Sequence, residues 1–324
     1  MGTRPKLLRK GHAGMRWTQM ILIAAWVVAP LGSLPAASAK VLEVGPDKPY
    51  KQPSEAIAAA ESGDDVRIAS GQYFDCAIVK QDDLTIEGIG PDAVLTDKTC
   101  AGKAILVIDS KNVTVRNLTL QRARVPDRNG AGIRAEGGDL TVENTRFINN
   151  ENGILSADNP SATFRVTGSS FIGNGHCDGS CAHGLYIGHA KLLHVDHSRF
   201  FDTHVGHNIK SRALRTEIID CDIEDGPTGS SSYLIEAPNG GTLIVERNKM
   251  EKGKLTQNQG NTIMIGSEGV TQPTEQIIIR DNNFTNDQNR STTFVTNRTA
   301  TPAELSGNVF KGPVRPLDGD GTVR

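Results

Sequence analysis

The chain has 324 residues, of which 22% are charged and 37% hydrophobic, and it contains 34 glycines. Apolar residues recur along the whole chain, which excludes a disordered protein, and the glycines keep no three-residue period, which excludes collagen. The abundance of Gly and Asn also disfavours a helical bundle, because both residues weaken helix interiors. This composition therefore favours an all-β protein with many turns.

Residues 1–39 have the pattern of a signal peptide. Five basic residues precede or adjoin an apolar run over 20–34, and Ala37-Ser38-Ala39 supplies small residues where a signal peptidase cleaves. The run is short for a membrane span and contains Pro30 and Gly32. We therefore expect a periplasmic or secreted protein with no membrane span after removal of this segment. An uncleaved N-terminal anchor is the alternative.

The mature chain is acidic. Residues 1–39 hold five of the 35 basic residues and none of the 37 acidic ones, so the rest carries a formal charge of −7. This balance disfavours a nucleic-acid partner.

Four of the five cysteines fall into two pairs that are close in the sequence. Cys76 is followed by Cys100, and Cys177 is followed after a short gap by Cys181. An exported chain meets an oxidising compartment, so two disulfides are expected, with Cys221 left over.

The first predicted element is a short helix over residues 53–62. Pro53 and Ser54 open the run Ala56–Ala60, and Gly63-Asp64-Asp65 ends it before a strand at Val66-Arg67-Ile68. A helix at this place would cover the open end of a stack of strands and block edge-to-edge association.

An internal repeat follows the helix and determines the predicted architecture. Each copy has two apolar residues separated by one polar residue, then a polar corner, then an apolar residue five positions after the second one. The final apolar positions are 120, 147, 171, 200, 223, 250, 284 and 310. A bend-forming residue precedes most of them by two positions; these residues include Thr145, Ser169, Ser198, Asn248, Asn282 and Asn308.

A second short strand follows each copy, for example at Gly153-Ile154 and Gly184-Leu185. Short strands with a period of about 25 residues predict a β-solenoid whose coils stack at strand spacing, ~4.8 Å apart. A leucine-rich repeat protein is excluded because the repeats lack the regular Leu/Asn consensus, and a β-propeller is excluded because its blades need longer repeats. A β-sandwich is the remaining alternative, but it does not explain eight copies of one pattern.

The chain also resembles a known superfamily. The run SEAIAAAESGDDVRIASGQY with LTIEGIG (84–90), and the later NNENGIL (149–155) and HGLYIG (183–188), resemble pectate-lyase-like right-handed parallel β-helix proteins. The resemblance implies an all-β, single-stranded right-handed parallel β-helix with an N-terminal capping helix. We expect this domain over 40–312 and a C-terminal tail over 313–324. The superfamily includes lyases, epimerases, esterases, hydrolases and adhesins, so the resemblance specifies the fold and not the activity.

Seven of the eight histidines fall between His176 and His207, and two of them occupy equivalent places in successive coils. His183 and His207 each stand two residues before a buried position, and Asn152 takes that place one coil earlier. This spacing predicts a stacked Asn-His-His ladder. His189, His194, His197 and His204 are expected at corners or solvated strand positions.

The residue after each buried position should face outward, because strand side chains alternate. That row reads Arg134, Leu155, Tyr186 and Lys210, and Arg212 follows two residues further on. We therefore predict a cationic groove in which Lys210, Arg212, His183, His207 and Tyr186 are catalytic. Arg134, Asn152 and Glu236 are the predicted substrate-binding residues.

Such a groove suits an acidic, uronate-containing polysaccharide as partner. Lyase and C5-epimerase reactions both begin when a base removes the proton next to the carboxylate while cations stabilise the developing charge. Arg212 would hold the carboxylate, and Lys210 would serve as the base if nearby cations favour its neutral form. Tyr186 or His183 would donate a proton to the leaving oxygen. Lyases of the superfamily that act on alginate and chondroitin use a similar Lys/Arg pair.

The sequence also leaves other functions and metal sites open. A non-catalytic solenoid would bind glycan or support the cell envelope, and a glycoside hydrolase would need two facing carboxylates, for which Asp222 with Glu236 is the pair to test. His176, Cys177, Cys181 and His183 have a spacing that suits zinc, although bridged cysteines are expected instead. We predict no metal or cofactor as a requirement, with calcium at the acidic run 220–225 as the alternative, and we expect a monomer.

Overall fold

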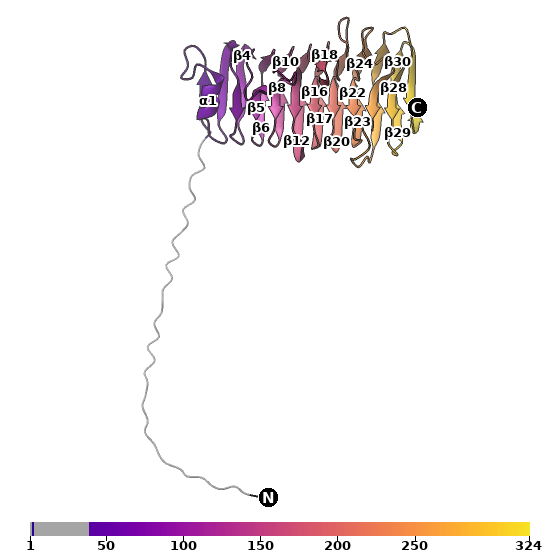
Figure 1. Ribbon diagram of the computed structural model, residues 1–324, viewed down its shortest axis with the longest axis horizontal. Coiled ribbons are helices and arrows are strands. Elements are labelled where there is room, and N and C mark those ends of the chain that lie inside the picture. Colours follow the sequence, from indigo (N-terminus) through magenta and orange to yellow (C-terminus); the bar gives the residue numbers. More distant parts are fainter. Residues whose placement is uncertain (1, 3–38) are drawn as a thin grey trace. The chain divides into compact units, whose positions relative to one another are not determined.

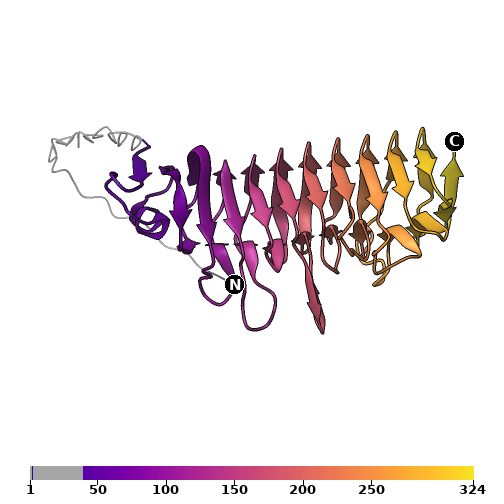
Figure 2. The same ribbon diagram turned by 90° about the horizontal axis from the view of Figure 1, so that it is seen from above.

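The computed structural model describes Gly2 and residues 39–324, so the predicted signal peptide lies outside the described residues except for Gly2 and Ala39 (Figure 1). Residues 39–324 form a stack of coils in which every paired long strand is parallel to its neighbours, as Figure 2 shows from above. The predicted β-solenoid is confirmed. In this part of the chain no helix is long and apolar enough to cross a membrane.

Each coil contributes strands to three ladders, which we call the first, second and third ladder. The first ladder contains these strands in order: β1 (Val41–Val44), β2 (Asp65–Tyr73), β4 (Thr85–Thr96), β6 (Val113–Arg116), β9 (Leu140–Glu143), β12 (Asn159–Thr167), β17 (Ala190–Asp196), β20 (Arg215–Ile219), β23 (Thr242–Glu246), β26 (Ile277–Arg280), β29 (Ala303–Ser306) and β32 (Gly321–Val323).

The second ladder begins with the ends of the long strands β2 and β4. It continues through β7 (Leu118–Gln121), β10 (Arg146–Ile148), β13 (Ser170–Ile172), β18 (Arg199–Phe201), β21 (Asp222–Glu224), β24 (Lys249–Lys252), β27 (Asn283–Asn286) and β30 (Val309–Lys311).

The third ladder carries the second short strand of each coil. Its members are β3 (Ala77–Val79), β5 (Ala104–Ile108), β8 (Ala131–Ala135), β11 (Asn152–Ser156), β16 (Leu185–Ile187), β19 (Ile209–Ser211), β22 (Ile235–Ala237), β25 (Asn261–Ile265), β28 (Thr292–Asn297) and β31 (Val314–Asp318).

In eight coils, the corner between the first and second ladders contains one residue with a left-handed backbone conformation. These residues are Asn117, Asn144, Gly168, His197, Asp220, Arg247, Asp281 and Gly307, with φ between 46° and 62°. The residue that follows is buried or half-buried. At Thr145, Ser169, Cys221, Asn248 and Asn282 its backbone N–H donates to the side chain at the same position one coil later.

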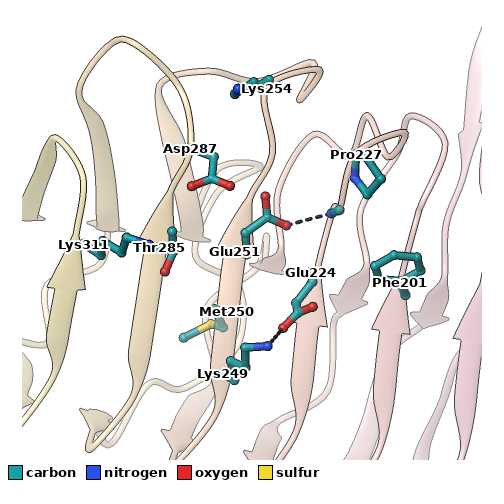
Figure 3. Close-up of a pocket in the computed structure, with 11 residues that line it drawn as sticks. Phe201, Glu224, Pro227, Lys249, Met250, Glu251, Lys254, Thr285, Asp287 and Lys311 are labelled. Atoms are coloured by element: carbon teal, nitrogen blue, oxygen red, sulfur yellow. Dashed lines mark hydrogen bonds and ion pairs between the residues drawn. The ribbon is translucent and has the colours of Figure 1, made fainter.

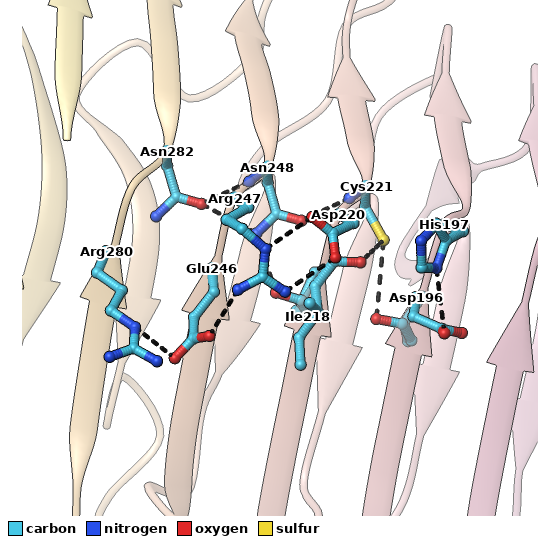
Figure 4. Close-up of polar contacts among 12 residues, drawn as sticks. Asp196, His197, Ile218, Asp220, Cys221, Glu246, Arg247, Asn248, Arg280 and Asn282 are labelled. Carbon is cyan, nitrogen blue, oxygen red and sulfur yellow. Dashed lines mark hydrogen bonds and ion pairs between the residues drawn. The ribbon is translucent and has the colours of Figure 1, made fainter. Parts of the chain in front are cut away.

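Asn248 shows how a side chain forms hydrogen bonds to the backbone groups at such a corner. Its Oδ1 accepts from Cys221 N–H at 2.8 Å, and its Nδ2 donates to the carbonyl of Ile218 (Figure 4). The predicted bend-forming positions are confirmed.

The interior of the solenoid is a continuous apolar core. The apolar positions of the repeat, such as Leu120, Phe147, Phe171 and Phe200, are fully buried. The last three stack ring on ring at centroid distances of 4.7 and 4.5 Å. Because each coil is too thin to bury these rings alone, the core depends on contacts between neighbouring coils.

The N-terminal end is closed by a helix, α1 (Pro53–Ala59). The helix begins at a proline, and its Glu55 carboxylate accepts from the backbone N–H of Gln52 at 3.1 Å. It ends before the predicted limit at residue 62, because Ala60 is extended. Ala56 and Ile57 are buried against the first coil.

The predicted C-terminal tail over 313–324 is wrong. Val314–Asp318 and Gly321–Val323 form β31 and β32, which add to the third and first ladders. The last coil has a neighbour on one side only and therefore buries few apolar side chains, so it lacks the strong repeat pattern.

Both predicted disulfides are present, and Cys221 is a free, buried thiol among the described residues. Cys177–Cys181 closes a small antiparallel hairpin of β14 (His176–Asp178) and β15 (Ser180–Ala182), which projects from the coil stack. The sulfur atoms of Cys177 and Cys181 are therefore unavailable to zinc.

Candidate functional site

The outward row of the third ladder aligns as predicted. Leu155 lies opposite Arg134 on one side and Tyr186 on the other, and Tyr186 lies opposite Lys210. The row continues to Glu236 in the next coil. Parallel, in-register pairing therefore brings side chains that are distant in sequence to within one coil of each other.

The Asn-His-His ladder is also present, and it is hydrogen-bonded from coil to coil. Asn152 Oδ1 accepts from His183 N–H at 2.8 Å, and His183 Nδ1 accepts from His207 N–H at 2.9 Å. His207 Nδ1 in turn accepts from Tyr233 N–H at 3.2 Å. The two imidazole rings stack with centroids 4.6 Å apart.

These contacts fix the state of both imidazoles. Because each Nδ1 accepts a backbone N–H, the proton of the neutral ring is assigned to Nε2. His183 is buried, and this burial, together with the positive charges of Lys210 and Arg212, holds its pKa well below the usual value. His183 is therefore a neutral ring inside the ladder rather than an exposed proton donor. His207 directs Nε2 to a carboxylate oxygen of Glu236 at 3.1 Å.

The cationic groove predicted from sequence is wrong in its charge, because two carboxylates balance the two cations. Lys210 Nζ lies 3.1 Å from Glu236 and 2.7 Å from Glu268, and Arg212 Nη2 lies 2.6 Å from the other oxygen of Glu268. Ser267 Oγ donates to Glu236 at 2.7 Å. We call Lys210, Arg212, Glu236 and Glu268 the ionic cluster.

The ionic cluster reverses the expected state of Lys210. Burial lowers its pKa, but the two carboxylates outweigh burial, so the pKa is raised above the ordinary value. Burial raises the pKa of Glu236, yet the contacts from His207 and Lys210 bring it down to about 2. Lys210 is therefore a fixed ammonium ion and does not suit the predicted role of a base.

Tyr186 lies beside the two cations. Arg212 Nε donates to its hydroxyl oxygen at 2.9 Å, and Arg212 Nη1 donates to Asn239. Lys210 Nζ lies 5.5 Å from the centroid of the Tyr186 ring. Tyr186 is half-buried, so its side chain combines partial exposure with a cationic partner at the hydroxyl oxygen.

Other predicted residues lie away from this group. Arg134 is two coils distant and pairs with Glu136 at 3.2 Å, and Asn152 is fully buried within the ladder. The proposed hydrolytic pair is wrong, because Asp222 is exposed on the second ladder whereas Glu236 is buried on the third.

Glu268 is the member of the ionic cluster that the sequence did not predict. It lies in the loop between β25 and β26, 58 residues after Lys210. Its backbone N–H donates to the carbonyl of Pro238, which places the loop over the third ladder. The only signal for it is the long separation between Met250 and Phe284, the largest in the repeat.

Among residues 39–324 no group of three or more His, Cys, Asp or Glu side chains is placed to hold a metal ion. The acidic run does not gather around one point. Asp220 pairs with Arg247 at the corner, Asp222 is exposed, and Asp225 is fully buried.

The coil stack defines the chain as a parallel β-helix protein, and one family model agrees with this assignment. Residues 57–200 match the family model described as "Right handed beta helix region". The predicted right-handed parallel β-helix is thereby confirmed.

The solved structures that match this chain are distant from it in sequence. An alginate lyase from Paenibacillus sp. str. FPU-7 is 13% identical with a TM-score of 0.43, covering 87% of this chain and 99% of its own. A pectin methylesterase from Aspergillus niger is 12% identical with a TM-score of 0.45, covering 88% and 92%.

ORF18 of Geobacillus virus E2 is 11% identical with a TM-score of 0.48 and covers 82% of this chain. The present chain spans 55% of the length of that protein. No curated protein matches the chain.

Proposed function

We propose that the chain is an exported protein that acts on a uronate-containing polysaccharide, with Lys210 and Arg212 as its carboxylate-binding pair. One observation carries this proposal. The two cations already hold a carboxylate, that of Glu268, at 2.7 and 2.6 Å. A pair of donors that grips both oxygens of one carboxylate is the arrangement that a uronate ring requires.

Glu268 is suited to leave this position. Its side chain is 43% exposed and belongs to a loop, whereas the side chains of Lys210 and Arg212 are 10% and 16% exposed and lie on or next to the rigid strand β19. A uronate carboxylate that enters from solvent would replace Glu268 without changing the charge of the site. The substrate would then lie across the outward row of the third ladder.

The chemistry that fits these groups is removal of the proton next to the carboxylate. Lys210 and Arg212 would stabilise the enolate-like charge that develops on the substrate. Tyr186 lies beside them, and its ionised oxygen, which accepts a hydrogen bond from Arg212 Nε, would take this proton. In elimination the C4–O bond then breaks, and Tyr186 gives the proton to the leaving oxygen. In epimerisation Tyr186 passes the proton to solvent, and water delivers a proton to the opposite face of the same carbon.

The test is incubation of the protein with alginate, pectate and glycosaminoglycans. Elimination gives unsaturated products that absorb at about 235 nm, and epimerisation in deuterium oxide gives exchange of the ring hydrogen. We expect Arg212→Ala and Tyr186→Phe to lose at least about 100-fold in rate, the range typical of a lost acid–base or charge-stabilising group. Arg165→Ala, at an exposed strand position, is the matched control. Folded protein that gives neither product nor exchange would refute the proposal.

A second candidate function is polysaccharide binding without reaction. The burial of Lys210 and Glu236, with side chains 10% and 4% exposed, favours this candidate because such groups reach solvent poorly. It predicts saturable binding of alginate or pectate that survives Tyr186→Phe, with no product from the wild-type protein.

A further inference from the structure

A cleft of 580 Å³ opens on the outer face of the second ladder, in the coils that contain β21, β24 and β27 (Figure 3). Its floor is a row of in-register side chains in which Glu224, Glu251 and Thr285 follow one another, one per coil. Lys254 and Asp287, from the loops that follow β24 and β27, stand at its rim. The ionic cluster lies on the third ladder and contributes nothing to this cleft.

Two of its three carboxyl groups are free to act on a ligand. Glu224 is occupied by an ion pair with Lys249 at 2.5 Å. Glu251 accepts one hydrogen bond through Oε2, from Gly226 N–H at 2.7 Å, and its other oxygen has no hydrogen-bond partner among residues 39–324. The Asp287 side chain is exposed and has no ion pair within the same residues. Figure 3 shows Glu251 and Asp287 next to each other on successive coils.

The surroundings of Glu251 favour its protonated form. Burial raises its pKa to about 7, and the nearby carboxylates of Asp225, Asp287 and Glu224 act in the same direction against the hydrogen bond from Gly226. Lys249 is committed to Glu224, and the buried Lys252 donates to Ser232 and Thr256. A carboxyl with a raised pKa beside a second carboxyl is an arrangement used for general acid–base chemistry.

We infer that this cleft is a second catalytic site, which hydrolyses a glycosidic bond with Glu251 as the proton donor and Asp287 as the base. Glu251 gives its proton to the glycosidic oxygen as the C1–O bond breaks, so the leaving sugar departs as an alcohol. Water adds to C1, and Asp287 takes the proton that the water loses. The products are one hemiacetal and one alcohol, and proton transfer between the two carboxyl groups restores the starting state.

The charges of the cleft indicate the kind of glycan. Lys254 and Lys311 line it and are exposed, and neither makes an ion pair within the described part of the chain. Two ammonium groups beside the acid–base pair favour a glycan that carries carboxylates over a neutral one. The inference does not depend on the reaction proposed for Tyr186 and Arg212.

The test measures reducing ends and unsaturated product in each sample. One set of samples contains polyuronates, and the other contains neutral glycans such as xylan and β-glucan. Hydrolysis creates reducing ends without absorbance at about 235 nm, whereas elimination creates both together. We expect reducing ends in the polyuronate arm, formed without matching absorbance, and a loss of at least about 100-fold in Glu251→Gln and in Asp287→Asn.

Glu251→Gln keeps the size of the side chain and the acceptor for Gly226, so it should fold, and a thermal melt checks this. Glu304→Gln, at an exposed position of the first ladder, is the control. Hydrolysis should fall on the alkaline side of about pH 7, where Glu251 loses its proton. It should persist in Arg212→Ala, which separates this site from the ionic cluster. The inference is overturned if reducing ends never exceed the unsaturated product, if they form only in the neutral arm, or if they survive Glu251→Gln.

Discussion

Replacing Glu236 by Gln tests whether the ionic cluster is held together by a permanently ionised carboxylate. Glu236 is buried and contacts His207, Lys210 and Ser267. Its pKa is about 2 in the folded chain against 4.5 for the ordinary group. At about 1.36 kcal/mol per unit, this difference corresponds to about 3 kcal/mol of folding stability at neutral pH.

The sign of the pH dependence follows from the lowered pKa. The contribution of Glu236 is complete above about pH 4.5 and disappears as the pH falls toward 2. Glu236→Gln should therefore lower the free energy of unfolding by about 3 kcal/mol at pH 7, and the difference from wild type should shrink steadily in acid. Urea unfolding across this pH range measures both quantities.

Glu304→Gln, at an exposed position, is the control and should change the free energy of unfolding by less than about 0.5 kcal/mol at any pH. A loss in Glu236→Gln that stays constant from pH 7 to about pH 3 would refute the reasoning, because only the ionised carboxylate distinguishes the two side chains over that range.

Three further changes test the coil stack and the cleft. Asn248→Ala leaves the N–H of Cys221 and the carbonyl of Ile218 unpaired in the core, and it should lower the free energy of unfolding in urea by about 2–5 kcal/mol. Asn308→Ala, at the half-buried end of the same row of corner residues, should cost less, and equal losses would contradict a role for burial. Phe171→Ala removes the middle ring of the aromatic stack and should cost about 3–5 kcal/mol by calorimetry, whereas a cost below about 1 kcal/mol would mean that the core closes over the space. Glu251→Gln should raise the thermal midpoint at about pH 8 and leave it unchanged near pH 4, because the raised pKa makes ionisation of Glu251 unfavourable to folding; a shift independent of pH would contradict this assignment.

The repeat alone determined much of the fold and part of the site. Parallel coils in register place equivalent positions of the repeat next to each other, so the separation of His183 and His207 by one repeat was enough to predict their stacking. The alignment of Tyr186 with Lys210 followed from the same rule. Such inferences succeed because they need only a local period and the alternation of side chains along a strand.

Only the tertiary structure determines the net charge around Lys210 and Arg212 and the protonation of the groups in the two sites. Glu268 reaches Lys210 and Arg212 from a loop whose length and path have no period, so no spacing in the sequence reveals that the two cations are neutralised. In the same way, Glu251 and Asp287 form a pair only because a strand residue in one coil faces a loop residue in the next. The protonation of each group depends on burial and on neighbours from other coils, and these are properties of the folded stack rather than of any single repeat.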